Sequence, residues 1–104
     1  MFDFFKNILV ASDNSRLTEA IKEGAFLVDV RSPGEFASGS ARGAVNIPLE
    51  RIASELSRFR GKSNIVVFCR SGNRSGQAMR ILEQNGVRDV INGGTWQNVQ
   101  QCII

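Results

Sequence analysis

Apolar and polar residues follow one another in blocks along the chain, and the spacing within each block indicates one kind of element. Short apolar runs rich in β-branched residues predict buried strands, whereas apolar residues three or four positions apart predict helix faces. Strands are expected over Ile8–Val10, Ala25–Val30, Ala44–Ile47, Ile65–Phe68 and Val87–Ile91. Strands that alternate with helices are typical of an α/β domain with a mainly parallel sheet.

Helices are expected between these runs, each with a sequence signal for its end. The predicted helices contain Leu17, Ala20 and Ile21 before Gly24; Leu49 to Phe59 before Gly61; Ser75 to Leu82 before Gly86; and Trp96 to Ile103 after the cap Thr95. The residues from Ser32 to Gly43 predict a loop with one helical turn, and Asn92–Gly94 predicts a turn.

Cys69 ends the most apolar of these runs and is followed by a polar, glycine-containing stretch. It therefore lies between the carboxyl end of a strand and the amino end of a helix. The free amides and partial positive charge at a helix start stabilise a thiolate, and such sites lower a cysteine pKa from about 8.5 to between roughly 3.5 and 7.5. This position predicts a reactive thiol.

Arg70 and Arg74 are the candidate cations beside that thiol. If residues 69 to 74 curl around the sulfur, their amides form a concavity for a small oxyanion. The alternative is that Cys69 is only a small apolar residue at the end of a core strand, since free cysteines are often buried. Two guanidinium groups and a glycine directly after it favour the functional interpretation.

The composition excludes several classes of protein. A chain of 104 residues with 42% apolar residues is expected to form one domain, and no apolar stretch reaches the roughly 18 residues of a membrane span. No signal-peptide cleavage pattern follows Met1–Val10. Two cysteines without a CxxC spacing do not predict disulfides, so a cytoplasmic location is expected.

The chain contains no histidine, which removes a Cys-His dyad and histidine-based metal sites. No metal site is predicted, and Cys69 would have to be activated by amides and arginines. The net charge of +3 comes from scattered basic residues, so no nucleic-acid partner is expected. A small anion is the partner that this charge favours.

The segment Cys69-Arg-Ser-Gly-Asn-Arg-Ser75 resembles the active-site loop of single-domain rhodaneses, which carry sulfur on a cysteine persulfide. Three other stretches resemble the same family in the same order: Leu27–Arg31 with Glu35-Phe36, Gly43–Pro48, and Asn92–Trp96. Together the four cover most of the chain. The chain departs from the family at Ser40 and Arg42, where a histidine and a proline are usual, and no catalytic role is expected for Ser40.

The resemblance implies a rhodanese fold, with about five strands and helices on both faces, and a thiosulfate sulfurtransferase activity without a cofactor. Cys69 would be the nucleophile, and the anion-binding loop would consist of Arg70, Ser71, Gly72, Asn73, Arg74 and Ser75. The implied partners are a small anionic sulfur donor, such as thiosulfate or a persulfide, and a thiol or cyanide acceptor. A sulfur-relay protein is a further candidate partner.

Residues outside the loop have both structural and functional interpretations. Parallel strands share one rim at their carboxyl ends, so Asp29, Cys69 and Asn92 are expected to border one site. Asp29 and Arg31 would either form the rim of the pocket or pair with each other, and the pair is favoured. Cys102 is expected to pack passively near the last helix.

Two other functions remain open. Cysteine phosphatases and arsenate reductases also bind an oxyanion in a loop between strand and helix, but their motif has five residues between cysteine and arginine. Cys69 and Arg74 enclose only four. A non-catalytic rhodanese-like module is the third candidate, although such a module would be expected to lose the cysteine.

Overall fold

The computed structural model describes residues 14–103, so the predicted strand Ile8–Val10 lies outside the described residues. Within this part, four strands form one sheet in the order β2-β1-β3-β4, and all neighbours are parallel. A helix over residues 14–22 precedes the sheet. The further elements are β1 (Phe26–Asp29), α2 (Pro33–Ser38), β2 (Val45–Asn46), the 3₁₀ helices η1 (Leu49–Ser54) and η2 (Leu56–Arg58), β3 (Ile65–Cys69), α3 (Asn73–Gln84), β4 (Val90–Thr95) and α4 (Trp96–Cys102).

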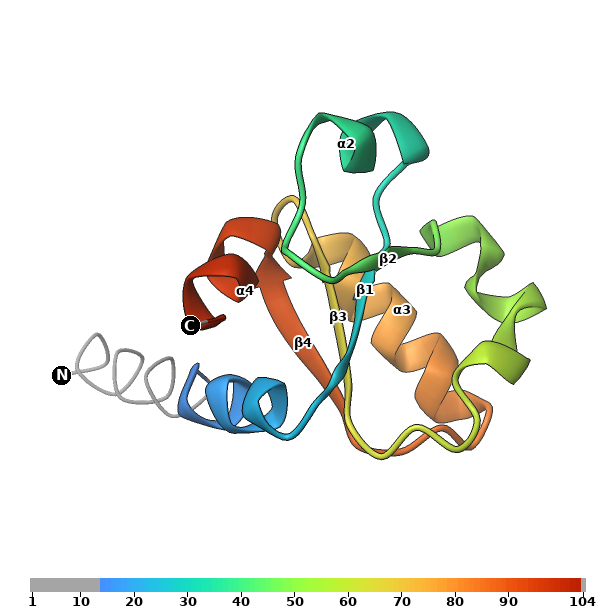
Figure 1. Ribbon diagram of the computed structural model, residues 1–104. Helices are drawn as coiled ribbons and strands as arrows, with labels where there is room; N and C mark the ends of the chain where they lie inside the picture. Colours follow the sequence, from blue (N-terminus) through green and yellow to red (C-terminus); the bar gives the residue numbers. More distant parts are fainter. Residues whose placement is uncertain (1–13, 104) are drawn as a thin grey trace, which may run out of the picture.

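Helices cover both faces of the sheet, which confirms the predicted α/β fold (Figure 1). On one face, Val67 and Val28 pack with Leu82 of α3 and Ile52 of η1. On the other face, Val66 and Phe68 pack with Leu17 of the first helix and Val99 of α4. All five residues of β3 are buried, because this central strand has a core on each side.

The predicted helix over residues 49–59 is wrong, because two 3₁₀ helices occupy this segment. Glu55 separates them with φ −122° and ψ 30°, and its amide bonds the Ile52 carbonyl three residues back. The Ser54 hydroxyl also donates to the Arg51 carbonyl at 3.0 Å. Such local serine hydrogen bonds compete with the continued α-helix, so the apolar spacing is satisfied by shorter turns.

The last strand begins later than predicted, at Val90 instead of Val87. The Val87 amide still donates to the Leu82 carbonyl of α3, at 3.0 Å. Asp89 then has φ 60°, a left-handed conformation that no strand residue adopts. The chain can enter the sheet only after this residue.

The predicted turn over Asn92–Gly94 is also wrong, because these residues belong to β4. Val67 pairs with Asn92 and Phe68 pairs with Gly94, which leaves Gly93 as the extra residue of a β-bulge. A Cβ atom on Gly93 would lie only 2.6 Å from the Val99 side chain. Glycine is therefore required at this position for space, and the two glycines serve the strand instead of a turn.

α2 is the short helical turn expected between β1 and β2, and it has a complete capping box. The Ser32 hydroxyl accepts from the Glu35 amide at 3.3 Å, and the Ser32 amide donates to the Glu35 carboxylate at 3.1 Å. This cap fixes the Glu35 side chain beside the carboxyl end of β1. No helix in the described part of the chain is both long enough and apolar enough to cross a membrane.

Candidate active site around Cys69

Cys69 is the last residue of β3, and the loop after it leads directly into α3. Gly72 caps α3 with φ 94°, a left-handed conformation that glycine adopts without strain. This turn directs the Gly72 amide back toward the strand end. The sequence thus places the thiol where predicted, between a strand and a helix start.

The Cys69 side chain has no exposed surface, and its sulfur receives hydrogen bonds from the loop around it. The Gly72 amide donates to Sγ at 3.0 Å, and the Ser75 amide donates at 3.4 Å. The Ser75 hydroxyl also lies 3.4 Å from Sγ. The loop therefore surrounds the sulfur with donors, as the anion-binding concavity requires.

Asn92 connects β4 to this loop through both ends of its side-chain amide. Its Nδ2 donates to the Gly72 carbonyl at 3.1 Å, while its Oδ1 accepts from the Ser75 hydroxyl at 2.7 Å. A serine hydroxyl has one proton, which it gives either to Asn92 or to the sulfur. When Cys69 is a thiol, the thiol can donate to Ser75; when it is a thiolate, the Ser75 proton can turn to the sulfur.

These contacts decide the acidity of the thiol. Burial on its own would raise the pKa of Cys69, but the hydrogen bonds outweigh it and hold this pKa below its usual value. The Ser75 hydroxyl contributes most to the lowering, followed by the amides of Ser75, Ser71 and Gly72. The guanidinium groups, predicted to share this role, are not among the main contributors.

Arg74 instead binds Glu35 of α2 in a bidentate ion pair. Its Nη1 and Nη2 donate to the two carboxylate oxygens at 2.8 and 3.0 Å. The hydrogen bond from Arg74, together with the Ser32 amide, holds the pKa of Glu35 far below its usual range. Arg70 is exposed and forms no ion pair within residues 14–103.

Asp29 and Arg31 form the favoured pair at the end of β1, and both are buried. Arg31 Nη2 donates to Asp29 Oδ2 at 2.7 Å and also to the Gly39 carbonyl. The Ser40 hydroxyl donates to the same carboxylate oxygen at 2.7 Å. The Arg31 guanidinium lies 5.6 Å from the centre of the Trp96 ring. These bonds fix the connection between α2 and β2, and a place on a pocket rim remains a prediction for both residues.

The structure brings most of the predicted site residues to one end of the sheet. Ser71, Gly72 and Ser75 supply groups that bond the sulfur, whereas the Asn73 side chain is exposed at the start of α3 and has no such role. Two contacts of this end were not predicted, Asn92 with Ser75 and Glu35 with Arg74. The Ser-x-x-Glu capping pattern at Ser32 was the one local signal that Glu35 has a fixed position.

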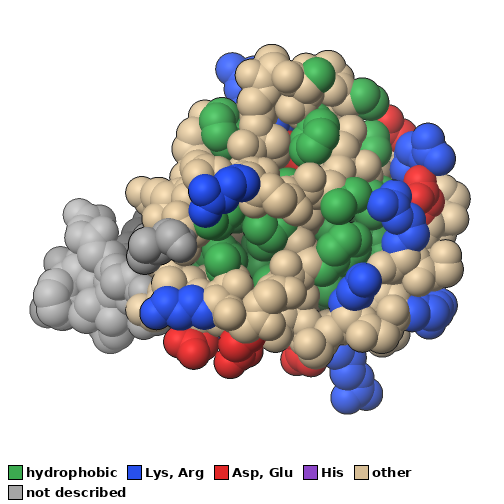
Figure 2. All heavy atoms as spheres, viewed as in Figure 1, with side chains coloured by type: hydrophobic (Ala, Val, Ile, Leu, Met, Phe, Trp, Pro, Cys, Tyr) green, Lys and Arg blue, Asp and Glu red, His purple; other side chains and the backbone are tan. Residues whose placement is uncertain are grey.

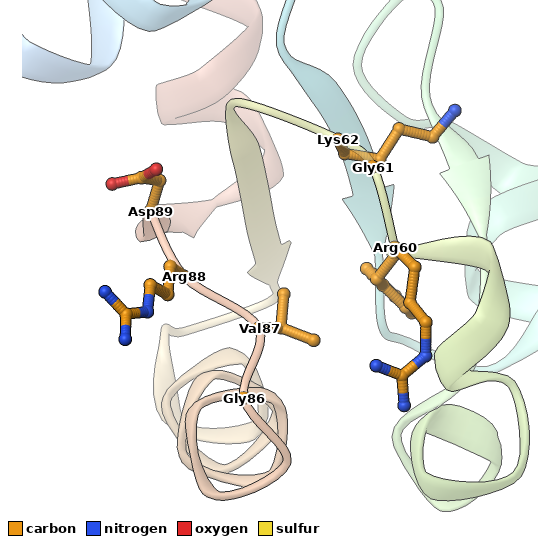
Figure 3. A pocket seen from close by; sticks show the side chains of 8 residues that line it. Arg60, Gly61, Lys62, Gly86, Val87, Arg88 and Asp89 are labelled. Carbon is orange, nitrogen blue, oxygen red and sulfur yellow. The ribbon is translucent and has the colours of Figure 1, made fainter.

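A separate hollow of about 260 Å³ lies at the opposite end of the sheet. It is lined by Phe59, Arg60, Gly61, Lys62, Gly86, Val87, Arg88 and Asp89. Figure 3 shows Arg60 and Arg88 on either side of Val87, while Lys62 and Asp89 point away from it. On the face seen in Figure 2, Lys and Arg side chains lie around the periphery and hydrophobic side chains lie nearer the centre.

Comparison with known proteins identifies similar chains. A model of the rhodanese-like domain family matches residues 13–98. A sulfurtransferase of Allochromatium vinosum is 39% identical over 70 residues, covering 67% of this chain and 65% of that protein. Thiosulfate sulfurtransferase PspE of Escherichia coli is 32% identical over 74 residues, covering 69% and 71%.

The fold comparison agrees with the sequence comparison. A solved rhodanese from Escherichia coli, described with anions, superposes with a TM-score of 0.65 at 31% identity. The superposition covers 72% of this chain and 91% of the solved one. The matched region spans between 40% and 65% of the length of three curated relatives.

Proposed function

The chain belongs to the rhodanese-like domain family, and we propose that it is a sulfurtransferase in which Cys69 carries sulfur as a persulfide. The observation that supports this most directly is the ring of donors around the buried Cys69 sulfur. Hydrogen bonds that lower the thiol pKa increase the fraction of thiolate at a given pH without a histidine base. The named sulfurtransferases among the relatives support the same reaction class.

The proposed reaction has two covalent half-reactions. The Cys69 thiolate attacks the outer sulfur of a donor such as thiosulfate, and the bond between the two donor sulfurs breaks. The electron pair of that bond leaves with sulfite, and Cys69 becomes a persulfide. A thiol or cyanide then takes the terminal sulfur and returns the thiolate, so no oxidant or reductant is consumed.

The loop has a defined role in each step. The amides of Ser71, Gly72 and Ser75 stabilise negative charge on the sulfur before attack and on the persulfide afterwards. Arg74, with the amides of the loop, is proposed to face the departing anion, and Arg70 is the second candidate for this role. A cytoplasmic thiol or a sulfur-relay protein is the proposed acceptor.

Intact-mass analysis after incubation with thiosulfate tests this function. One added sulfur is expected, located on the Cys69 peptide and removed by cyanide or dithiothreitol. Cys69→Ser should abolish both the adduct and thiocyanate formation, because a hydroxyl has a far higher pKa and cannot form a persulfide. Cys102→Ser is the control, since Cys102 is buried in the opposite core layer, and it should retain turnover.

The same preparation distinguishes the alternatives. Hydrolysis of p-nitrophenyl phosphate that Cys69→Ser abolishes, without any sulfur adduct, would replace the proposal with a phosphatase. Absence of both activities in the folded protein would instead favour a non-catalytic module.

A further inference from the structure

Arg74, at the start of α3, forms an ion pair with Glu35 through its guanidinium group. Both terminal nitrogens of Arg74 donate to the Glu35 carboxylate, at 2.8 and 3.0 Å. The Ser32 amide and hydroxyl hold Glu35 Oε1 from the other side, each at 3.1 Å. The carboxylate is thus fixed by the cap of α2 and is not free to follow Arg74 elsewhere.

This pair also changes the charge at the carboxyl end of the sheet. Three arginines lie near the loop, and two of them are neutralised: Arg31 by Asp29 and Arg74 by Glu35. The pair of Arg74 and Glu35 is only partly exposed, with 35% and 31% of the side chains accessible. An incoming anion therefore meets the negative charge of Glu35 together with the positive charge of Arg74.

We propose that Glu35 is a specificity-determining residue that lowers the advantage of dianionic thiosulfate over sulfur donors with one negative charge or none. Organic persulfides and thiosulfonates are the donor classes with this charge. The proposal rests on the sulfurtransferase function above and concerns its choice among donors. Coulomb energy is proportional to the charge of the ligand, so a dianion loses twice as much as a monoanion when Glu35 cancels Arg74.

The chemistry is the same for each donor. The Cys69 thiolate attacks the terminal sulfur, the sulfur–sulfur or thiosulfonate bond of the donor breaks, and the leaving group departs with its electron pair. That leaving group is sulfite from thiosulfate, a sulfinate from a thiosulfonate and a thiolate from a persulfide. The donors therefore share this step, and they differ in the leaving group and in the charge that they bring to the loop.

Glu35→Gln tests the proposal while keeping the cap of α2. Glutamine can accept from the Ser32 amide as glutamate does, so the capping box is preserved while the charge is removed. The kcat/KM for thiosulfate should rise by roughly three- to tenfold, the size expected for one unit charge acting on a dianion near a protein surface. The value for methanethiosulfonate, a monoanion, should rise by about the square root of that factor.

A charge cycle separates this effect from a change in shape. Arg74→Ala leaves the Glu35 charge unpaired and should lower kcat/KM for thiosulfate, whereas the double variant Glu35→Gln/Arg74→Ala, with both charges removed, should recover part of that loss. Glu55→Gln is the matched control, since Glu55 pairs with Arg51 and Arg58 on the 3₁₀ helices. It should leave the ratio between the two donors unchanged.

The following results would contradict the proposal. An equal change for both donors in Glu35→Gln, or a lower kcat/KM for thiosulfate at an unchanged circular dichroism spectrum, would overturn the selectivity proposal alone. If neither donor loads Cys69 in the wild-type protein, the sulfurtransferase function is wrong and this proposal is wrong with it.

Discussion

The arginines at the two ends of the sheet differ in their ion pairs. At the carboxyl end, Arg31 and Arg74 each bind a carboxylate, and the surrounding polar groups bond one another. At the amino end, Arg60 and Arg88 flank an open hollow and form no ion pair within residues 14–103 (Figure 3). Arg31 and Arg74 are therefore positioned and paired at the carboxyl end, whereas Arg70 and the two arginines of the hollow are exposed.

Hydrogen bonds lower the pKa of the Cys69 thiol more than the charges of the arginines do. Arginines follow Cys69 closely in the sequence, but hydrogen bonds from the Ser75 hydroxyl and from three amides are what chiefly oppose the effect of burial. Fixed short-range donors act on the sulfur in a water-free environment, where each hydrogen bond has more effect than a screened surface charge. Charge at this end is better suited to choosing the donor than to creating the thiolate.

The carboxyl end of the sheet is tightly packed at Gly93, and Gly93→Ala tests this packing with the largest expected effect. The new methyl group would lie 2.6 Å from the Val99 side chain, so the free energy of unfolding, measured with urea, should fall by about 1–3 kcal/mol. Gly34→Ala is the control, because a Cβ atom on Gly34 would have no other atom within 4 Å and the backbone there is not left-handed. Equal stability of the two variants would show that the end of the sheet near Cys69 is not tightly packed.

Ser75→Ala tests the source of thiol activation. Loss of the hydroxyl should raise the pKa of Cys69 and so lower the rate of alkylation by iodoacetamide at pH 7 by roughly tenfold or more, the effect of one hydrogen bond to a charged group. Followed against pH, the rate should reach its plateau at a higher pH than in the wild type. Since the wild-type pKa is lowered, its own plateau should begin below the pH expected for a free cysteine, whose pKa is about 8.5.

The matched control for this measurement is Ser57→Ala, whose hydroxyl lies on an exposed turn of η2. Its alkylation profile should coincide with that of the wild type. If the pH dependence of the alkylation rate shifted in Arg74→Ala but not in Ser75→Ala, the Arg74 guanidinium, and not the Ser75 hydroxyl, would be the group that lowers the pKa of Cys69.

The smallest effect is expected at the hollow. Arg60→Ala and Arg88→Ala should each change kcat/KM for thiosulfate by less than about twofold at about 0.1 M salt. The hollow lies beyond the start of β3 and Cys69 lies at its end, about 13 Å along the strand, which exceeds the screening length of about 10 Å at this salt concentration. A change as large as that in Arg74→Ala would mean that the hollow takes part in donor binding.

The sequence alone determined the parts of this protein that depend on neighbouring residues. The apolar run before Cys69 predicts β3, Gly86 follows the end of α3 with φ 82°, and the Thr95 hydroxyl caps α4 as predicted. These signals are local, because a cap, a turn or a buried run is set by the residues within a few positions of it. They sufficed to place the thiol between a strand and a helix.

Only the tertiary structure decided which side chains meet around that thiol. Asn92 pairs with Val67 in the sheet and reaches Ser75 from there, 17 positions away in the chain, and Glu35 reaches Arg74 across 39 positions. A sequence pattern shows that an arginine follows the cysteine but not which carboxylate it binds. Pairings over such separations depend on how strands and helices pack. Here they hold the Ser75 hydroxyl through Asn92 and pair the charge of Arg74 with that of Glu35.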